Sequence, residues 1–280
     1  MMRGLRSGIQ RVSTVLTPVL FVVLLLLIVR SVTLPGASEG IAWYLLKFSW
    51  ADVNASVALA ALGQVIFSVA LGGTFMVVYG SYMDSKDPLG STAVWTVAGD
   101  TVAGLLAGLA IFPAVFALGL EPNSGPGLLF ATLPEVFAAM PMGRVAGLAF
   151  FLALGGAAYL SALAAFEVLV AGVTDSTRFT RKQATFLTAG TVMLFSVPPM
   201  LNMGVFVPWD LTFGTGFQTV GALAAALTFG WALDRGAALE ELATGGGSRR
   251  VVFLYWWIRL AIPLAILAVG TWWLVDEVLR

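Results

Sequence analysis

The chain has 280 residues, of which 59% are hydrophobic and only 11% charged, and its 15 basic side chains balance its 15 acidic ones. A soluble domain carries roughly 25% charged residues, so water cannot be the main solvent of this protein. The scattered charges form no basic stripe that would predict a nucleic-acid partner. The lack of Cys and His excludes disulfides, thiolate nucleophiles, the usual general base and the usual zinc ligands.

Seven apolar runs are long enough, at about 17 to 25 residues each, to cross a bilayer. They fall near residues 13–32, 58–82, 92–118, 145–173, 184–201, 211–233 and 251–275. Each run should be a helix, because backbone groups in lipid must be satisfied within the segment and no run alternates like a barrel strand. The sequence therefore predicts an all-α, polytopic fold in which residues 1–280 form a single transmembrane domain.

The basic residues near the ends of these runs predict how the protein is oriented in the membrane. One side carries Arg3, Arg6, Arg11, Lys86, Arg178, Arg181, Lys182, Arg235, Arg249 and Arg250, and the other carries Arg30, Lys47, Arg144 and Arg280. We expect the richer side to be cytoplasmic. The protein then lies in the cell (inner) membrane, with its N-terminus in the cytoplasm and its C-terminus outside. The first run is a retained transmembrane span.

The connection over residues 121–143 is long and contains the apolar stretch GPGLLFATLPEVFAAMP, which is too short to cross comfortably. Pro134 interrupts it, and apolar residues of this kind suit an interfacial position. The pattern predicts a pair of short helices in an extracellular, lid-like loop. An ordinary packed loop is the alternative.

The middle of the second run, residues 68–74, has two hydroxyls and two adjacent glycines where a simple span would have Leu. Gly72 and Gly73 each lower helix propensity by roughly 1 kcal/mol relative to Ala. A helix that opens there must line a cavity, and its free carbonyls or amides can then bind an ion. The alternative is close packing through small residues.

Polar residues inside the third and fourth runs are further candidates for function. Asp100 lies about two turns into the third run, where a carboxylate costs about 2.5 to 3.5 kcal/mol and needs a cation, a proton or a partner; a helix cap near the surface is the alternative. Gly104 and Gly108 follow it at a spacing that allows a close neighbour. The fourth run places Ser161 and Glu167 in the membrane, and Arg259 is available by charge to pair with Glu167.

Several motifs occur in one order along the chain, namely GQVIFSVALGG, AGLAIFPAVFALG, GPGLLFATLPEVF and FFLALGGAAYLSALAAFEVLVAGVTD. Over nearly the whole chain they resemble the neurotransmitter:sodium symporter family, especially its bacterial members. The resemblance implies a LeuT-type fold, in which the seven runs match the family's fifth to eleventh helices and residues 58–233 form the second inverted repeat. The family's first four helices have no counterpart in this sequence.

The resemblance also implies a binding site. The substrate would contact Phe67, Ser68, Ala70 and Gly73 on the broken helix and Ser161 and Ala165 on the fourth run. The small side chains at three of these positions favour a larger apolar or aromatic amino acid.

The same resemblance assigns ion ligands. Ser68 and Asp100 would bind one sodium ion, and Ala157 and Ser161 a second, although Leu160 replaces an oxygen-bearing residue there. One sodium site is therefore expected and the second is doubtful. Chloride is not expected, because Gly104 replaces a serine and Asp100 would supply the fixed negative charge instead.

Three residues would act as gates by the same resemblance, with Tyr82 and Asp175 on the inner side and Asp210 on the outer side. From the sequence alone, a solvated carboxylate at the membrane face is the favoured interpretation of both acids. The arginine partners of these acids precede or lie on the absent first helix of the family.

The predicted function is sodium-coupled symport of an amino acid, with the missing helices supplied by a separate chain. The alternative is a truncated or noncatalytic membrane subunit without independent transport. An enzyme is not expected, because the intramembrane carboxylates form no recognisable catalytic set. The expected partners are an amino-acid substrate and the lipid bilayer, with no nucleic acid.

Overall fold

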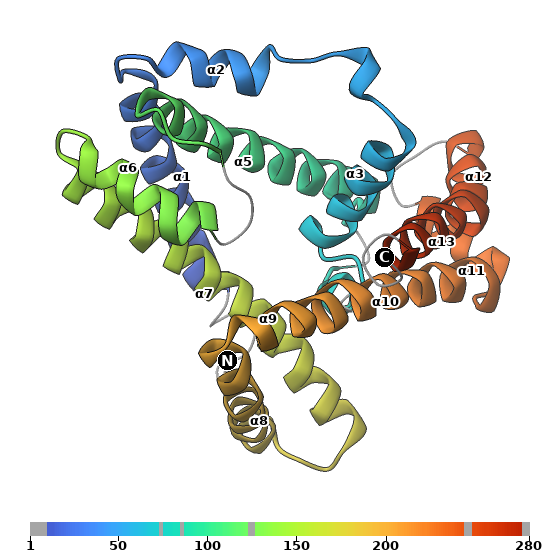
Figure 1. Cartoon of the computed structure of the whole chain (residues 1–280). Coiled ribbons are helices and arrows are strands. Elements are labelled where there is room, and N and C mark those ends of the chain that lie inside the picture. Colours follow the sequence, from blue (N-terminus) through green and yellow to red (C-terminus); the bar gives the residue numbers. More distant parts are fainter. Residues whose placement is uncertain (1–9, 73–74, 85–86, 123–126, 244–247, 276–280) are drawn as a thin grey trace. The chain divides into compact units, whose positions relative to one another are not determined.

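The computed structural model describes residues 10–72, 75–84, 87–122, 127–243 and 248–275 (Figure 1). Helices dominate these ranges, and none of the residues within them forms a strand. The chain divides into two compact units. Unit 1 comprises Met1–Trp50 and Thr101–Glu167, and unit 2 comprises Ala51–Asp100 and Val168–Arg280.

Five described helices are long and apolar enough to cross a membrane. They are α1 (Gln10–Val32), α5 (Leu89–Ala117), α7 (Gly143–Ser176), α8 (Arg181–Leu201) and the stretch Arg250–Trp272. A sixth candidate, Gly204–Ala232, is followed by α11 (Arg235–Ala243) after a bend of 110°. The prediction of an all-α polytopic membrane protein is confirmed. The predicted second run differs from the others, because it is divided into α3 (Ala55–Ser68) and α4 (Phe75–Gly80).

In unit 1, two short helices pack against the last turns of α5. In α2 (Ala37–Leu45), Trp43 packs on Phe112 with ring centroids 5.0 Å apart. Tyr44 lies over Gly108, where a Cβ would overlap its phenol ring. The predicted close approach at Gly108 is therefore confirmed, whereas a Cβ at Gly104 would meet nothing within 4 Å. Burial raises the pKa of Tyr44, and its hydroxyl donates to the Leu105 carbonyl at 3.4 Å.

The predicted loop at 121–143 contains one continuous helix in its described part, not a pair of short helices. A π-helical turn, η3 (Leu128–Thr132), runs directly into α6 (Leu133–Ala139). Pro134 follows this π-helical turn as the second residue of α6, and the helix continues through it to Ala139. Leu133 and Val136 are 2% and 1% exposed and pack against Val115. Because its apolar side chains form part of the core of unit 1, this segment is more than a surface loop.

In the described part of unit 2, three π-helical segments lie within otherwise α-helical runs. After α9 (Met203–Trp209) comes η4 (Asp210–Gly216), then α10 (Phe217–Leu227) and η5 (Thr228–Ala232). After α11, α12 (Ser248–Trp256) continues through η6 (Trp257–Ala261) into α13 (Ile262–Trp273). α10 and α13 pack against α3 through Ile66, Ala222, Ala226 and Ile266. π-helical turns often lie at functional sites.

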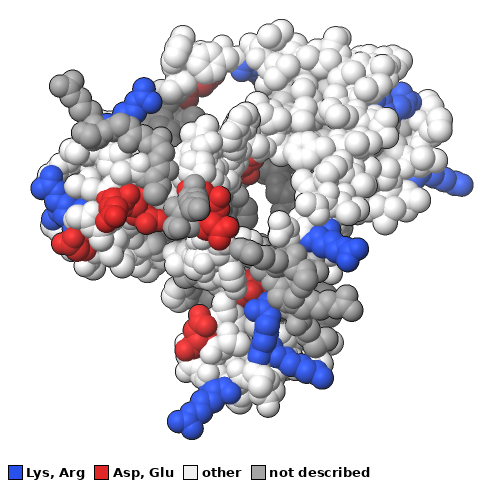
Figure 2. All heavy atoms as spheres, turned by 180° about the vertical axis from the view of Figure 1, so that it is seen from behind, with Lys and Arg blue, Asp and Glu red and all other residues white. Residues whose placement is uncertain are grey.

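Much of the surface is apolar. On α8, the side chains of Met193, Leu194 and Met200 are 73%, 70% and 78% exposed. Figure 2 shows one face of the molecule, on which charged side chains form small groups between large uncharged areas. A water-soluble monomer rarely exposes apolar area on this scale, which agrees with a membrane environment.

Candidate functional site

The broken helix ends in a Schellman motif. Ala70 has a φ of 53° and donates its N–H to the Phe67 carbonyl, and Leu71 donates its N–H to the Ile66 carbonyl. This pair of hydrogen bonds satisfies carbonyls in the last turn of α3. Glycine usually occupies the left-handed position, because a side chain there costs roughly 1 to 2 kcal/mol. The predicted helix break is confirmed, but Ala70 and not a glycine makes the turn.

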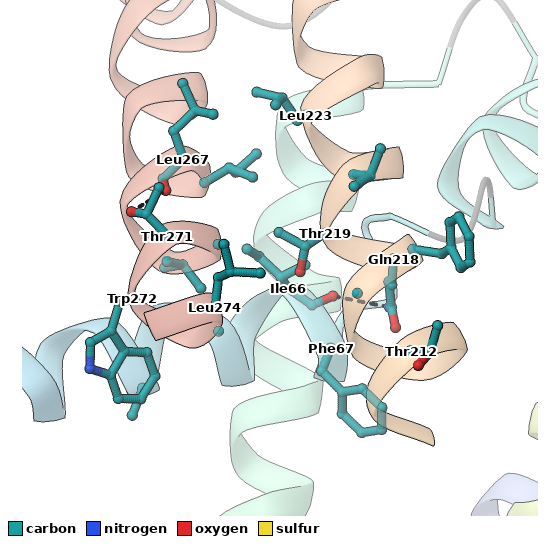
Figure 3. A pocket seen from close by; sticks show the side chains of 18 residues that line it. Ile66, Phe67, Thr212, Gln218, Thr219, Leu223, Leu267, Thr271, Trp272 and Leu274 are labelled. Carbon is teal, nitrogen blue, oxygen red and sulfur yellow. Dashed lines mark hydrogen bonds between the residues drawn. The ribbon is translucent and has the colours of Figure 1, made fainter. Parts of the chain in front are cut away.

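Gly72 serves a different purpose, which is close contact with α10. A Cβ on Gly72 would overlap the Gln218 carbonyl, and a Cβ on Gly221 would overlap the carbonyl oxygen of Gly72. The side-chain amide of Gln218 also donates to the Ile66 carbonyl at 3.3 Å (Figure 3). The backbone at the break therefore packs directly against the backbone of α10.

Ser68 and Asp100 meet beside this break. The Ser68 hydroxyl lies 2.7 Å from both carboxylate oxygens of Asp100 and donates to that group. A hydroxyl bond to an ionised carboxylate is short and strong. Asp100 comes from the part of α5 that belongs to unit 2, so this pair forms within one compact unit. Two positions that the sequence predicted to share a sodium ion are therefore neighbours.

For the other predicted residues of the broken segment, the structure gives the position of Phe67 and Tyr82 but not of Gly73. Phe67 is the residue before the last one of α3, and its side chain is 56% exposed. Gly73 lies outside the described residues, so its predicted substrate contact stays a prediction. Tyr82 follows α4 and is 40% exposed.

The predicted ligands on the fourth run lie on α7, in the part that belongs to unit 1. Ala157 and Ser161 are exposed and Ala165 is half-buried, and α7 is an uninterrupted α-helix there. The Ser161 hydroxyl has no hydrogen bond to any described residue, so it does not bond back to the preceding turn. Nothing in the local backbone marks these three positions.

The two predicted gate acids lie at helix ends in unit 2. Asp175 is next to last in α7, and Asp210 is the first residue of η4. Both are exposed, and no described basic side chain forms an ion pair with either of them.

A cavity of about 760 Å³ opens beside the break, between α3, η4, α10 and α13. Its walls are mainly apolar. Figure 3 shows Phe67 near Thr212 at one end, with Gln218 and Thr219 on α10 and Thr271 and Trp272 across from them. Phe67 lines this cavity, whereas Ser68, Ala70 and Asp100 do not. The cavity and the Ser68–Asp100 pair are therefore separate features that adjoin at Phe67.

The donor atoms at the Ser68–Asp100 pair suit a hard cation. A carboxylate and a hydroxyl supply only oxygen, which alkali and alkaline-earth ions prefer, and neither atom type selects a transition metal. Among the described residues, no three of the side chains Asp, Glu, His and Cys come together as a metal cluster. The pair therefore offers one carboxylate and one hydroxyl to a hard cation.

The comparisons with known proteins decide the family. A model of the sodium:neurotransmitter symporter family matches residues 1–277. The chain belongs to this family.

Relatives and a solved structure support the assignment. An uncharacterised sodium-dependent transporter of Bacillus subtilis, YhdH, is 35% identical and matches 95% of this chain and 62% of its own length. An uncharacterised sodium-dependent transporter of Haemophilus influenzae is 32% identical over 95% of this chain and 61% of its own length. The crystal structure of MhsT in complex with L-phenylalanine is 35% identical, with a TM-score of 0.85 over 96% of this chain and 64% of that one. The chain thus spans about three fifths of the length of these curated relatives.

Gln218 and Gly221 contact the broken segment and were not predicted from the sequence. One signal was available for Gln218, because an amide inside an apolar run must find a hydrogen-bond partner in the membrane. For Gly221 no signal was available, since it is one of several small residues in the sequence GALAAA. Only the structure shows that it faces the backbone of Gly72.

Proposed function

We propose that this chain forms part of a sodium-coupled amino-acid symporter and that Ser68 and Asp100 bind the sodium ion. The observation that carries the proposal is the pair itself, with the Ser68 hydroxyl 2.7 Å from both oxygens of Asp100 at the end of a broken helix. A cation between these groups would offset the cost of a carboxylate inside an apolar helix.

The binding of sodium and of substrate would be coupled because their proposed contact residues are neighbours in the sequence. Phe67 and Ala70 flank Ser68, so a sodium ion at Ser68 would order the segment that contacts the substrate. Because binding linkage is reciprocal, sodium that favours substrate binding is itself bound more tightly when substrate is present. A sodium gradient could then drive substrate uptake.

A large apolar or aromatic amino acid is the proposed substrate. Ala70 and Ala165 have small side chains that leave room at the positions the family uses for substrate contact. The match to MhsT, whose crystal structure contains L-phenylalanine, supports the same size class.

One sodium ion and no chloride is the proposed stoichiometry. Leu160 supplies no oxygen beside Ala157 and Ser161, which weakens a second site on α7. Asp100 provides a permanent negative charge, so that a bound chloride is not needed to balance the sodium ion.

A noncatalytic membrane subunit is the second candidate. Two observations favour it, namely Leu160 at the second sodium position and the lack of a described basic partner for Asp175 and Asp210. It predicts a chain that inserts into the membrane without moving substrate.

Uptake by reconstituted liposomes tests the proposal. The chain is reconstituted alone and together with a polypeptide that carries the four helices preceding the matched segment in the family. L-[³H]phenylalanine uptake is then measured with an inward sodium gradient and with a potassium gradient. We expect uptake that requires both polypeptides and sodium. Equal uptake in potassium would contradict sodium coupling, and correct insertion of both polypeptides without any uptake would favour the noncatalytic subunit.

A further inference from the structure

Arg259 lies inside the last apolar run, where an unpaired guanidinium is costly. Its guanidinium lies 4.3 Å from the ring centroid of Trp231 and donates to the Tyr255 hydroxyl at 2.8 Å. Tyr255 lies one helical turn before Arg259, so the side chain extends back toward the Arg250 end of the helix. This direction is the one by which a long basic side chain in a membrane helix brings its charge to the interface.

Aromatic side chains indicate that this end of the helix lies at the membrane interface. Tyr255, Trp256 and Trp257 are consecutive, and Trp272 lies roughly 24 Å further along the helix at 1.5 Å per residue. Bands of Trp and Tyr at both ends of an apolar segment are typical of the two interfaces of a bilayer. These rings and the direction of the Arg259 side chain point its guanidinium toward the interface on the Arg250 side.

A second guanidinium approaches the same rings from a neighbouring helix. Arg235, the first residue of α11, lies 5.8 Å from the Tyr255 centroid and 6.0 Å from the Trp256 centroid. Arg259 lies 5.9 Å and 5.6 Å from those same two centroids. Two positive charges are thus held around one pair of aromatic rings, and an anion between them would relieve their repulsion.

The surrounding backbone fixes this arrangement. The indole N–H of Trp231 donates to the Arg259 carbonyl at 3.1 Å, and a Cβ on Gly230 would lie 2.9 Å from the Arg259 Cα. Both contacts join η5 to η6, the two π-helical segments of this corner. Tyr255 is 1% exposed, whereas Trp231 and Trp256 are 58% and 44% exposed. The rings are therefore fixed at their base and open at the surface.

No carboxylate of the described residues is paired with either guanidinium. The nearest acid in the sequence, Asp234, accepts hydrogen bonds from the N–H groups of Gly236 and Ala237 and so caps α11. Arg259 uses one donor on Tyr255, and a guanidinium has five. Its remaining donors, together with Arg235, match the oxygens of a phosphate group, which guanidinium groups bind with two parallel hydrogen bonds.

We propose that Arg235 and Arg259, with Trp231 and Trp256, bind the phosphodiester headgroup of an anionic phospholipid at the corner between α11 and η6. A lipid is favoured over a free anion because exposed indole rings lie beside the guanidiniums and suit the boundary between headgroups and acyl chains. The bent segment α11 would then lie along the membrane surface and be held there by the lipid.

Native mass spectrometry of the detergent-solubilised chain tests the proposal, with phosphatidylglycerol, phosphatidylcholine and inorganic phosphate as three separate probes. We expect phosphatidylglycerol to bind most tightly. Arg235→Gln should weaken its binding about fivefold, and Arg259→Lys should weaken it similarly, because the charge stays but the planar pair of donors is lost. Arg178→Gln, at another exposed arginine, is the matched control and should leave binding unchanged.

Three outcomes would overturn the proposal. Equal binding of phosphatidylglycerol and phosphatidylcholine would show that charge is not recognised. Displacement of the lipid by millimolar inorganic phosphate would show a site for a free anion. Unchanged phosphatidylglycerol binding by Arg235→Gln, which alters an exposed side chain and should fold, would show that the arginines only stabilise the corner.

Discussion

Two regions of this chain carry residues that the family resemblance assigns to sodium, and they are built in different ways. In the first, α3 ends at Ser68, Ala70 turns the backbone, and Asp100 accepts from Ser68 within the same unit. In the second, Ala157 and Ser161 project from α7, which continues as a regular helix past both of them. The first region has a geometry of its own, whereas the second offers side chains without a local structural feature. We therefore propose that sodium binding depends mainly on the first region.

The contact between Gly72 and α10 should give the largest effect on stability. A Cβ at this position would overlap the Gln218 carbonyl, which belongs to the backbone and cannot move independently. We expect Gly72→Ala to lower the free energy of unfolding by about 3 kcal/mol, measured as a lower melting temperature in detergent. Gly80→Ala is the control, because a Cβ there meets nothing within 4 Å. Equal melting temperatures for the two variants would show that the break is not held by this contact.

Removing the hydroxyl of Ser68 or of Ser161 tests which of the two regions binds sodium. We expect Ser68→Ala to raise the sodium concentration for half-maximal uptake about tenfold, because the hydroxyl oxygen is lost beside Asp100. Ser161→Ala on α7 should change the same value by less than about threefold. The measurement is a sodium titration of phenylalanine uptake by the assembled transporter. The reverse ranking would place the main sodium site on α7.

The charge of Asp100 should make transport independent of chloride. Replacing chloride by gluconate should leave wild-type uptake unchanged. In the double variant Asp100→Asn with Gly104→Ser, uptake should fall and be stimulated several-fold by chloride, because a Cβ at Gly104 meets nothing within 4 Å and a serine hydroxyl fits there. A wild-type protein that requires chloride would refute the idea that Asp100 replaces it.

Replacing alanine by glycine should stabilise the protein in the first region and destabilise it in the second. Ala70→Gly relieves a left-handed alanine and should stabilise the protein by up to about 1 kcal/mol. Ala157→Gly lies inside a regular helix and should destabilise it by about 0.5 to 1 kcal/mol. Thermal melting of both variants in one detergent measures the difference. A destabilising Ala70→Gly would indicate that the methyl group of Ala70 is needed for packing at the break.

Much of the fold and part of the site could be predicted from the sequence. Apolar length predicted the long helices, because lipid allows few alternatives to a helix, and the glycines and hydroxyls of residues 68–74 predicted the break. The left-handed residue could not be predicted, since alanine disfavours that conformation and the contact of Gly72 with α10 is visible only in the structure. Likewise, the apolar stretch at 121–143 was expected to be interrupted at Pro134, but the helix continues from η3 through Pro134 into α6.

The Ser68–Asp100 pairing could be expected only through the family. The two residues are separated by 32 positions, and nothing in the spacing of a single sequence brings them together. The corner at Arg259 illustrates the same limit. Its charge suggested Glu167 as a partner, but the structure places its guanidinium on Trp231 and Tyr255. Aromatic partners of a cation leave no charge pattern in a sequence.

Equilibrium binding of ²²Na⁺ to the transporter, reconstituted with the four preceding helices, measures whether Ser68 and Asp100 bind sodium. We expect the wild type to bind one sodium ion, Asp100→Asn to bind none, and Ser161→Ala to retain the binding. Retained binding in Asp100→Asn, with loss in Ser161→Ala, would contradict a sodium site at the broken end of α3.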